Sequence, residues 1–198
     1  MTVDRPALVI WCIEDDRAGH RRQLAGLAGA LQALRPAHIY RVGRTESPAQ
    51  LPAPDLILTA GRRSHWRGLR YRHLHGGKLV ALMDPGLPRT LFDLSIIPEH
   101  DGVPPAHNVL LSKGPLNPVK PASAAAANRG LILVGGPSRH YRWDNTDLMG
   151  QLQRLQAALP EVAWTLTTSP RTPASFIRLA RTLANPGLEV VALAETGP

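Results

Sequence analysis

The sequence has one cysteine, few aromatic residues and no long apolar run, and each shortage excludes a class of protein. Aromatic residues make up 5% of the 198 positions, and Cys12 is the single cysteine. Because it lies in an apolar run, this cysteine is expected to be a buried core residue. A single cysteine can form neither an intramolecular disulfide nor a cysteine-rich metal site, and this fits a protein of the reducing cytoplasm. No stretch approaches the ~20 apolar residues of a membrane helix, and the start shows no secretory signal. Any membrane contact is therefore expected to be peripheral.

Several catalytic motifs are also missing. The sequence contains no P-loop, no G-x-S-x-G elbow and no H-E-x-x-H helix. The first predicted strand is not followed by G-x-G-x-x-G, which disfavours a dinucleotide site. Asp15 and Asp16 have no further ligands at a recognised metal-binding spacing. No aromatic stacking platform or reading helix indicates nucleic acid.

The charge balance is strongly basic. Lysine and arginine number 23 against 15 acidic residues, so the net charge is 23 − 15 = +8. Most of the basic residues are arginine. This excess predicts binding to polyanions, anionic lipid headgroups or phosphorylated substrates.

The chain alternates short apolar runs with amphipathic segments, which predicts an α/β fold with parallel sheets. Residues 7–13 form an uninterrupted apolar run, typical of a strand buried on both faces. Leucines spaced three or four residues apart between 24 and 34 form one helix face, and a strand at 38–42 completes a βαβ unit. Further strands are predicted at 55–59, 78–83, 93–97 and 108–111, with a helix ending near Leu74.

Composition changes between residues 112 and 130, where prolines and an alanine run are typical of a linker. Strands predicted at 131–134, 162–168 and 188–194 then alternate with two helices. Asp144 or Asn145 is expected to cap the first of these helices, and Thr172 the second. We therefore predict an N-terminal Rossmann-like domain at 1–111, a linker at 112–130 and a partial C-terminal Rossmann-like domain at 131–198.

Two turns of the second domain are candidates for phosphate binding. A glycine pair at 135–136 lets the backbone approach a ligand, and the following helix start offers unpaired N–H groups and a positive dipole end. A plain connector fits the same residues. The turn at 169–172 resembles a phosphate- or ribose-contacting turn, although Thr172 can equally be a helix cap.

Three turns of the first domain carry ionisable groups. In the first, Gly19 allows a tight turn and His20 is a candidate general base or a solvated residue, while Asp15 or Asp16 is better explained as a helix cap. In the second, Gly61 precedes arginines whose forked side chains match phosphate or carboxylate oxygens. The basic patch expected there also contains His65, Arg67, Arg70, Arg72, His73, His75 and Lys78, unless these form a solvated helix face. In the third, a carboxylate beside His100 can orient it, or the loop can be capped without chemistry.

Five short motifs occur in one order along nearly the whole chain, and together they are more specific than any one of them. The motifs are Gly19-His20-x-x-Gln23; Pro54-Asp55 leading to Gly61-Arg62-Arg63; Pro98-Glu-His-Asp101 with Asn108-Val109; Gly135-Gly136-x-Ser138 with Tyr141 and Trp143; and Ser169-x-Arg171-Thr172-Pro173. In this order the sequence resembles the mitochondrial-fission ELM-type family, whose bacterial members are described as candidate glycosyltransferases.

The resemblance implies a GT-B-like architecture, in which two Rossmann-like domains work together and the second binds most of a nucleotide sugar. It implies that His20 is the catalytic base or an acceptor contact. No cofactor or metal is expected, because such enzymes usually need only the nucleotide-sugar donor. Relatives continue beyond residue 198, so part of the donor site is expected to be missing. Donor phosphate or nucleotide binding is assigned to Gly135, Gly136, Ser138, Ser169, Arg171 and Thr172, and acceptor or anion binding to Gly19, Gln23, Gly61, Arg62, Arg63, Glu99, His100 and Asp101.

Two hypotheses about function follow. The first is a metal-independent glycosyltransferase whose unknown acceptor can be membrane-linked, since a basic domain is attracted to anionic membrane. The second is a non-catalytic scaffold of the same family that binds membranes or proteins. A nucleotide-sugar epimerase is a weaker option, because the dinucleotide fingerprint is absent. A nucleotide sugar is the expected partner, an anionic membrane surface and a homo-oligomer stay open, and no nucleic acid is expected.

Overall fold

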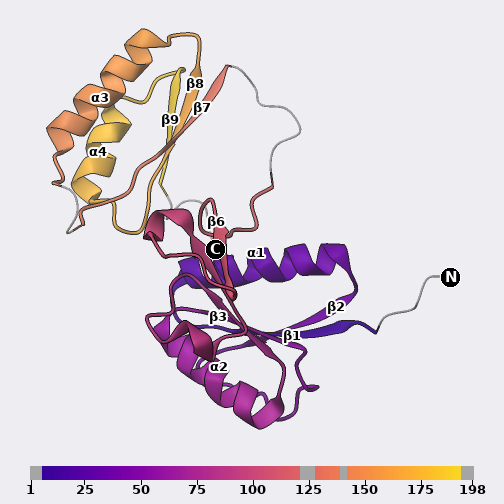
Figure 1. Cartoon of the computed structure of the whole chain (residues 1–198). Coiled ribbons are helices and arrows are strands. Elements are labelled where there is room, and N and C mark those ends of the chain that lie inside the picture. Colours follow the sequence, from indigo (N-terminus) through magenta and orange to yellow (C-terminus); the bar gives the residue numbers. More distant parts are fainter. Residues whose placement is uncertain (1–5, 121–127, 139–141, 193–198) are drawn as a thin grey trace. The chain divides into compact units, whose positions relative to one another are not determined.

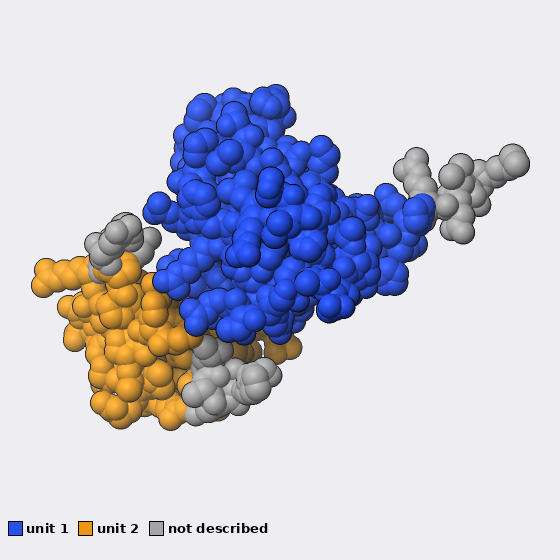
Figure 2. All heavy atoms as spheres, turned by 90° about the horizontal axis from the view of Figure 1, so that it is seen from below, with its two compact units in different colours: residues 1–121 blue, residues 122–198 orange. Residues whose placement is uncertain are grey.

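The computed structural model describes residues 6–120, 128–138 and 142–192, and the chain divides into two compact units (Figures 1 and 2). Unit 1 comprises residues 1–121 and unit 2 residues 122–198. Each unit contains one parallel sheet, as the alternation of apolar runs and amphipathic segments predicted.

In the described part of unit 1, six parallel strands form a sheet in the order β2-β1-β3-β4-β5-β6. α1 (Ala18–Leu34) covers one face and α2 (Arg62–His75) covers the other (Figure 1). Two short 3₁₀ turns, η1 (Arg89–Leu91) and η2 (Glu99–Asp101), flank β5. The strands are β1 (Leu8–Ile13), β2 (Ala37–Val42), β3 (Leu56–Ala60), β4 (Lys78–Leu82), β5 (Leu94–Pro98) and β6 (Val109–Ser112).

β1 is apolar throughout because both of its faces are covered. Ile10 and Cys12 belong to the core under α1, whereas Trp11 and Ile13 belong to the core under α2. Burial raises the pKa of the Cys12 thiol to about 12, and the nearby charge of Glu14 adds to the effect. Cys12 is therefore an inert core residue, which confirms the interpretation of this cysteine.

The strand order creates a switch point between β1 and β3. The chain passes from β1 to β2 on one side and from β3 to β4 on the other, so the two connecting helices leave in opposite directions. In open α/β sheets, ligands bind in the crevice at the carboxyl ends of the strands at such a point. α1 and α2 both begin at that crevice.

The first residues of the predicted linker pack on unit 1. Leu116 packs against the core that α1 covers, and a Cβ on Gly26 of α1 would lie 2.6 Å from the backbone carbon of Asn117. Because Gly26 has no side chain, the segment around Asn117 can pack closely against α1. The middle of the predicted linker, at 121–127, lies outside the described residues. The next strand begins at Arg129, before the predicted end of the linker.

In the described part of unit 2, three parallel strands are arranged in the order β7-β8-β9. Both helices pack on one face of this sheet and share a core that contains Leu152, Leu166, Phe176 and Leu188. On β7, Leu131 and Leu133 are exposed. The elements are β7 (Arg129–Leu133), α3 (Asn145–Ala158), β8 (Ala163–Thr167), α4 (Ala174–Thr182) and β9 (Leu188–Val191).

The two helix caps predicted for unit 2 have different outcomes. Asp144 caps α3, since its carboxylate accepts hydrogen bonds from the backbone N–H groups of Thr146 and Asp147 at 2.8 and 3.1 Å. The prediction for Thr172 is wrong. Pro173 is the N-cap of α4 without any side-chain cap, because the Thr172 hydroxyl is already engaged with another turn.

His65 fastens α2 to the sheet below it. Its ring is 1% exposed, lies edge-on to Phe92 and places Nδ1 2.9 Å from the hydroxyl of Thr59. That hydroxyl donates its one hydrogen to the carbonyl of Val80 at 3.0 Å, so it can only accept from a protonated Nδ1 of His65. The expectation that His65 belongs to a basic surface patch is therefore wrong, because helical periodicity turns it inward.

We expect folded stability to fall as the pH drops from about 7 to about 5. Burial, and secondarily the charge of His20, lowers the pKa of His65 from 6.5 to about 4, so the unfolded chain binds a proton that the folded chain refuses. The loss by pH 5 is about 2 kcal/mol, and it is absent above the unfolded pKa. Urea unfolding at both pH values measures it. His65→Leu should remove most of this pH dependence, while His73→Gln on the exposed side of α2 should keep it; equal slopes in all three proteins would contradict the assignment.

Candidate active site

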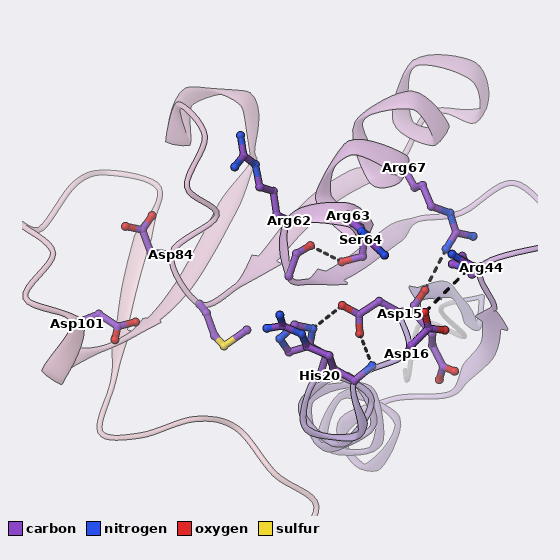
Figure 3. Close-up of a pocket in the computed structure, with 14 residues that line it drawn as sticks. Asp15, Asp16, His20, Arg44, Arg62, Arg63, Ser64, Arg67, Asp84 and Asp101 are labelled. Atoms are coloured by element: carbon purple, nitrogen blue, oxygen red, sulfur yellow. Dashed lines mark hydrogen bonds and ion pairs between the residues drawn. The ribbon is translucent and has the colours of Figure 1, made fainter. Parts of the chain in front are cut away.

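An open pocket of about 910 Å³ lies at the switch point of unit 1 (Figure 3). Its walls come from the turn after β1, the turn after β3 with the start of α2, and the end of β4. This volume is in the range of small-molecule sites. The lining residues are Glu14, Asp15, Asp16, Arg17, His20, Arg44, Gly61, Arg62, Arg63, Ser64, Arg67, Met83, Asp84 and Asp101.

At the floor of this pocket, Asp15 holds His20 (Figure 3). Asp15 Oδ2 lies 2.6 Å from His20 Nδ1, and the other carboxylate oxygen accepts the backbone N–H of Arg17 at 3.0 Å. The side chains of His20 and Asp15 are only 12% and 14% exposed. With Nδ1 engaged, Nε2 is the ring nitrogen left for a substrate, and Asp15 can stabilise the charge that His20 gains on accepting a proton.

Gly61 makes room for this pair. Its φ of +91° lies in a region that residues with side chains rarely adopt. A Cβ at this position would overlap the imidazole of His20 and approach Asp15 Oδ2 to 3.0 Å. Glycine is therefore required at 61 both by the backbone angle and by the two side chains above it.

The carboxylates that line the pocket all lie beside a basic side chain. Three of its carboxylates have arginine partners: Glu14 with Arg41, Asp16 with Arg44 at 3.9 Å, and Asp84 with Arg89 at 3.6 Å. Asp15 pairs with His20, and Asp101 lies 3.6 Å from His100.

Arg62 and Arg63 form no ion pair within the described part of the chain. Both lie in the first turn of α2, and neither α1 nor α2 has a side-chain cap or an acidic residue in its first turn. The unpaired N–H groups and positive dipole ends of the two helices therefore add to the arginines. This side of the pocket suits an anion such as a phosphate.

The remaining candidates of the first domain are less central than expected. Asp101 lines the pocket, whereas Glu99 and His100 do not. The contact of His100 with Asp101 is long and exposed, so it orients the ring weakly. Gly19 is an ordinary helical residue of α1 with open space beside it, not a tight turn, because α1 starts six residues before its first leucine. Gln23 lies 3.3 Å from the sulfur of Met83 and supports the pocket wall from behind.

Much of the predicted basic patch is used inside the fold. Arg67 donates to the carbonyls of Glu14 and Gly43 and stacks on Tyr71. Arg72 and Lys78 both pair with Asp93, whose pKa lies below its usual value because a backbone N–H and these cations outweigh its burial. These cations are engaged within the fold, whereas Arg62 and Arg63 line the pocket and form no ion pair among the described residues.

Met83 marks strain at the rim of the pocket. Its φ of +69° is unusual for a residue with a side chain, and it is the one such non-glycine among the described residues. Strain of this kind costs of the order of 1–3 kcal/mol and often occurs at functional sites. The position directly after β4 agrees with that tendency.

A second pocket, of about 520 Å³, lies in unit 2 beside the glycine pair. Gly135, Gly136, Ser138 and Arg171 line it, whereas Tyr141 of the family motif lies outside the described residues. Its other lining residues are Arg142, Trp143, Asp144, Asp147, Leu148 and Gln151.

The 169–172 turn supports this pocket from below. The Thr172 hydroxyl lies 2.6 Å from the carbonyl oxygen of Gly135 and accepts the N–H of Ser169 at 2.8 Å. A Cβ on Gly136 would overlap the backbone of Arg171. Ser169 and Thr172 thus hold the glycine turn in place, and Arg171 is the residue of the 169–172 turn that lines the pocket.

The start of α3 is less open to an anion than its sequence suggested. Asp144 occupies two of the first N–H groups, and Asp147 adds a second negative charge in the first turn. The carboxylates oppose the charges of Arg142 and Arg171 in the same pocket. Unpaired N–H groups at a helix start, which the sequence predicted here, are found instead at α1 and α2.

Sequence reasoning missed the role of Asp15. Asp15 or Asp16 was expected to cap α1, but the N-cap is Arg17 and no side chain caps it. A signal was present, since a carboxylate and a histidine five residues apart lie on either side of a strand–helix turn. Glu14, Asp16, Arg17, Arg44, Ser64, Met83 and Asp84 were also not predicted as pocket residues.

Two features are absent from the described part of the chain. No group of three or more His, Cys, Asp or Glu side chains is placed to hold a metal ion. No helix is long and apolar enough to cross a membrane.

Comparison with known proteins gives a family and a fold. Residues 18–198 match the family model described as Mitochondrial fission ELM1. An uncharacterized protein of Rickettsia prowazekii is 33% identical over 114 residues, which cover 46% of this chain and 32% of that protein. The chain therefore spans about a third of the length of this curated relative.

Solved structures resemble the chain at low sequence identity. MnaA of S. aureus, solved with UDP, matches with a TM-score of 0.57 and 13% identity, covering 96% of this chain and 69% of that one. A candidate UDP-N-acetylglucosamine 2-epimerase of Listeria monocytogenes matches with a TM-score of 0.55 and 11% identity, covering 94% and 69%. These likenesses confirm the predicted GT-B-like fold class.

Replacing Gly61 should damage the site, whereas replacing Gly19 should not. Gly61→Ala places a methyl group against His20 at a positive φ, so we expect a loss of about 1–3 kcal/mol in folding free energy and displacement of the ring. Gly19→Ala adds a methyl group in open space on a helix and should be neutral or stabilising by up to about 1 kcal/mol. Urea midpoints measure stability, and the NMR signals of the histidine rings report displacement. Similar behaviour of the two variants would contradict the steric role of Gly61.

Proposed function

The chain belongs to the mitochondrial fission ELM1 family, and we propose that it acts in glycosyl transfer from a nucleotide-sugar donor. The observation that carries this proposal is the Asp15–His20 pair at the floor of the switch-point pocket. The GT-B-like fold supports it, and so does the UDP with which the S. aureus neighbour was solved.

His20 is the proposed general base. Its Nε2 takes the proton of an acceptor hydroxyl while the acceptor oxygen bonds to the sugar carbon, and the bond from that carbon to the diphosphate breaks. Asp15 keeps the proton-accepting nitrogen directed away from itself and stabilises the imidazolium that forms. General base catalysis by a positioned histidine contributes typically ~10²–10⁴-fold in rate.

Unit 2 is the proposed donor side. Open space lies beside Gly135, which leaves its backbone approachable by a phosphate, and Ser138 and Arg171 line the same pocket. Ser169 and Thr172 support the donor site by holding the turn. Gly136→Val is a poor probe, since its side chain would push against the backbone of Arg171 and move the whole turn.

The epimerase option calls for a test of its own, because one structural neighbour is described as a candidate 2-epimerase. An identity of 11% carries the fold and not the reaction. The two reactions differ in one requirement: an epimerase converts its nucleotide sugar without an acceptor, whereas a transferase releases a nucleoside diphosphate only when a hydroxyl is supplied. Product analysis with and without acceptor separates them.

Arg171 should matter for nucleotide binding. Arg171→Ala removes one of the two arginines of the glycine-turn pocket, so we expect UDP or a UDP-sugar to bind about tenfold more weakly. Arg178→Ala is the control, because Arg178 is also an exposed arginine of unit 2 but does not line the pocket. Calorimetry with UDP, GDP, ADP and CMP sugars measures both variants. If none of the four binds the unaltered chain, the donor proposal fails.

His20 and Asp15 should control turnover. His20→Gln should lower kcat by about 10²–10⁴, and Asp15→Asn should lower it by about 10–100-fold because the ring loses its orienting partner. Asp16→Asn is a matched control, since the Asp16 carboxylate is 75% exposed and touches only Arg44 at 3.9 Å. Release of nucleoside diphosphate with an accepted substrate gives the rates. Equal turnover of Asp15→Asn and Asp16→Asn would overturn the proposed base.

A further inference from the structure

The outer face of α2 has an unusual composition. The helix contains five arginines and three histidines but no carboxylate in its 14 residues. His65 faces inward, as do Ser64 and Gly68. At about 100° per residue, the exposed side chains fall within about 120° of the helix circumference. These side chains, called the α2 outer face below, are Arg62, Arg63, Trp66, Arg70, His73 and Leu74.

Two large apolar side chains on this face are exposed. Trp66 is 55% and Leu74 57% exposed, at positions two turns apart on the same stripe. Tryptophan places an apolar body and a polar N–H at the boundary between lipid headgroups and acyl chains. Single exposed apolar residues are common, but here they alternate with cations along one helix.

The arginines of this face are free of acidic partners. Arg62, Arg63 and Arg70 form no ion pair within the described part of the chain. The same helix pairs Arg72 with Asp93 and stacks Arg67 on Tyr71, so its inward and lateral cations are neutralised or packed. The cations on the exposed side are therefore the ones that stay available to an anionic surface. Cations interleaved with Trp and Leu are the pattern of a surface that lies on anionic lipid.

We propose that the α2 outer face of unit 1 docks on a membrane containing anionic lipids. The cations contact phosphate headgroups, and Trp66 and Leu74 enter the headgroup boundary. Arg62 and Arg63 belong both to this face and to the switch-point pocket, so the pocket opens beside the docked surface. The inference goes beyond the proposed function, because the face binds lipid whether or not the pocket transfers sugar.

The test uses residues of the face that do not line the pocket. Vesicles of phosphatidylcholine alone and vesicles containing phosphatidylglycerol are sedimented with the full chain at low and high salt. We expect binding to the anionic vesicles only, weakening as salt screens the charges. Arg70→Glu changes the charge by two units, and each unit near an anionic surface is worth about fivefold in binding. We therefore expect this variant to bind the anionic vesicles about thirtyfold more weakly. Trp66→Ala should also weaken binding to the anionic vesicles, because no tryptophan ring then enters the headgroup boundary.

Matched controls separate the face from net charge. Arg178→Glu makes the same charge change on unit 2, and Leu34→Ala removes a leucine that is 83% exposed on α1. Both controls should bind vesicles like the unaltered chain. Equal losses for Arg70→Glu and Arg178→Glu would overturn the proposal, as would the absence of binding to anionic vesicles at low salt. Binding of duplex DNA, sensitive to Arg70→Glu, without vesicle binding would assign the face to nucleic acid instead.

Insertion of Trp66 can be followed directly. The chain has four tryptophans, and Trp66 is the one of these four whose side chain is largely exposed. Lipids brominated along the acyl chain should quench the emission of the unaltered chain, and Trp66→Phe should lose most of that quenching while still sedimenting. Unchanged quenching in Trp66→Phe would show that this face does not enter the bilayer. Calorimetry with the nucleotide sugar on Arg70→Glu shows whether donor binding is intact, so a failure of docking is distinguishable from a failure of the proposed function.

Discussion

The hydrogen bond between Asp15 and His20 is the interaction on which the first site depends. It exists because a short turn joins the end of β1 at Ile13 to the start of α1 at Ala18, so that a carboxylate in that turn meets a ring in the first turn of the helix. Gly61 leaves the space that the pair fills, at a backbone angle that disfavours any side chain. The catalytic proposal therefore depends on a strand–helix junction and on one glycine from a neighbouring strand.

The two units differ in how they present themselves to an anion. In unit 1, two helices start without side-chain caps, and Arg62 and Arg63 form no ion pair with any residue that the structure describes. In unit 2, Asp144 already occupies the start of α3, so an anion there depends more on the glycine backbone and on Arg171. The same sequence pattern, a glycine turn before a helix, thus gives two electrostatic environments. The difference arises because the Asp144 carboxylate caps α3, whereas no side chain caps α1 or α2.

α2 serves three purposes with three faces. Its inner face holds the helix on the sheet, where Gly68 allows close approach and His65 bonds to Thr59. Its N-terminus forms a wall of the pocket. Its outer face carries unpaired cations with Trp66 and Leu74. A helix with so many like charges is stable here because its stability comes from the packed face, and the solvated cations cost little.

Sequence alone determined the elements, the α/β class and the family resemblance, because apolar periodicity and local turn chemistry are properties of neighbouring residues. It placed His20, Gly61, Arg62 and Arg63 on the right turns, but it could not show that Asp15 orients His20 and does not cap α1. Only the tertiary structure decided which charges stay free, which histidine is buried, and that Thr172 clamps Gly135. These outcomes depend on contacts between segments that are distant in the sequence, such as the turn after β3 and the β1–α1 turn. The strand order brings these segments together, and local sequence patterns do not determine that order.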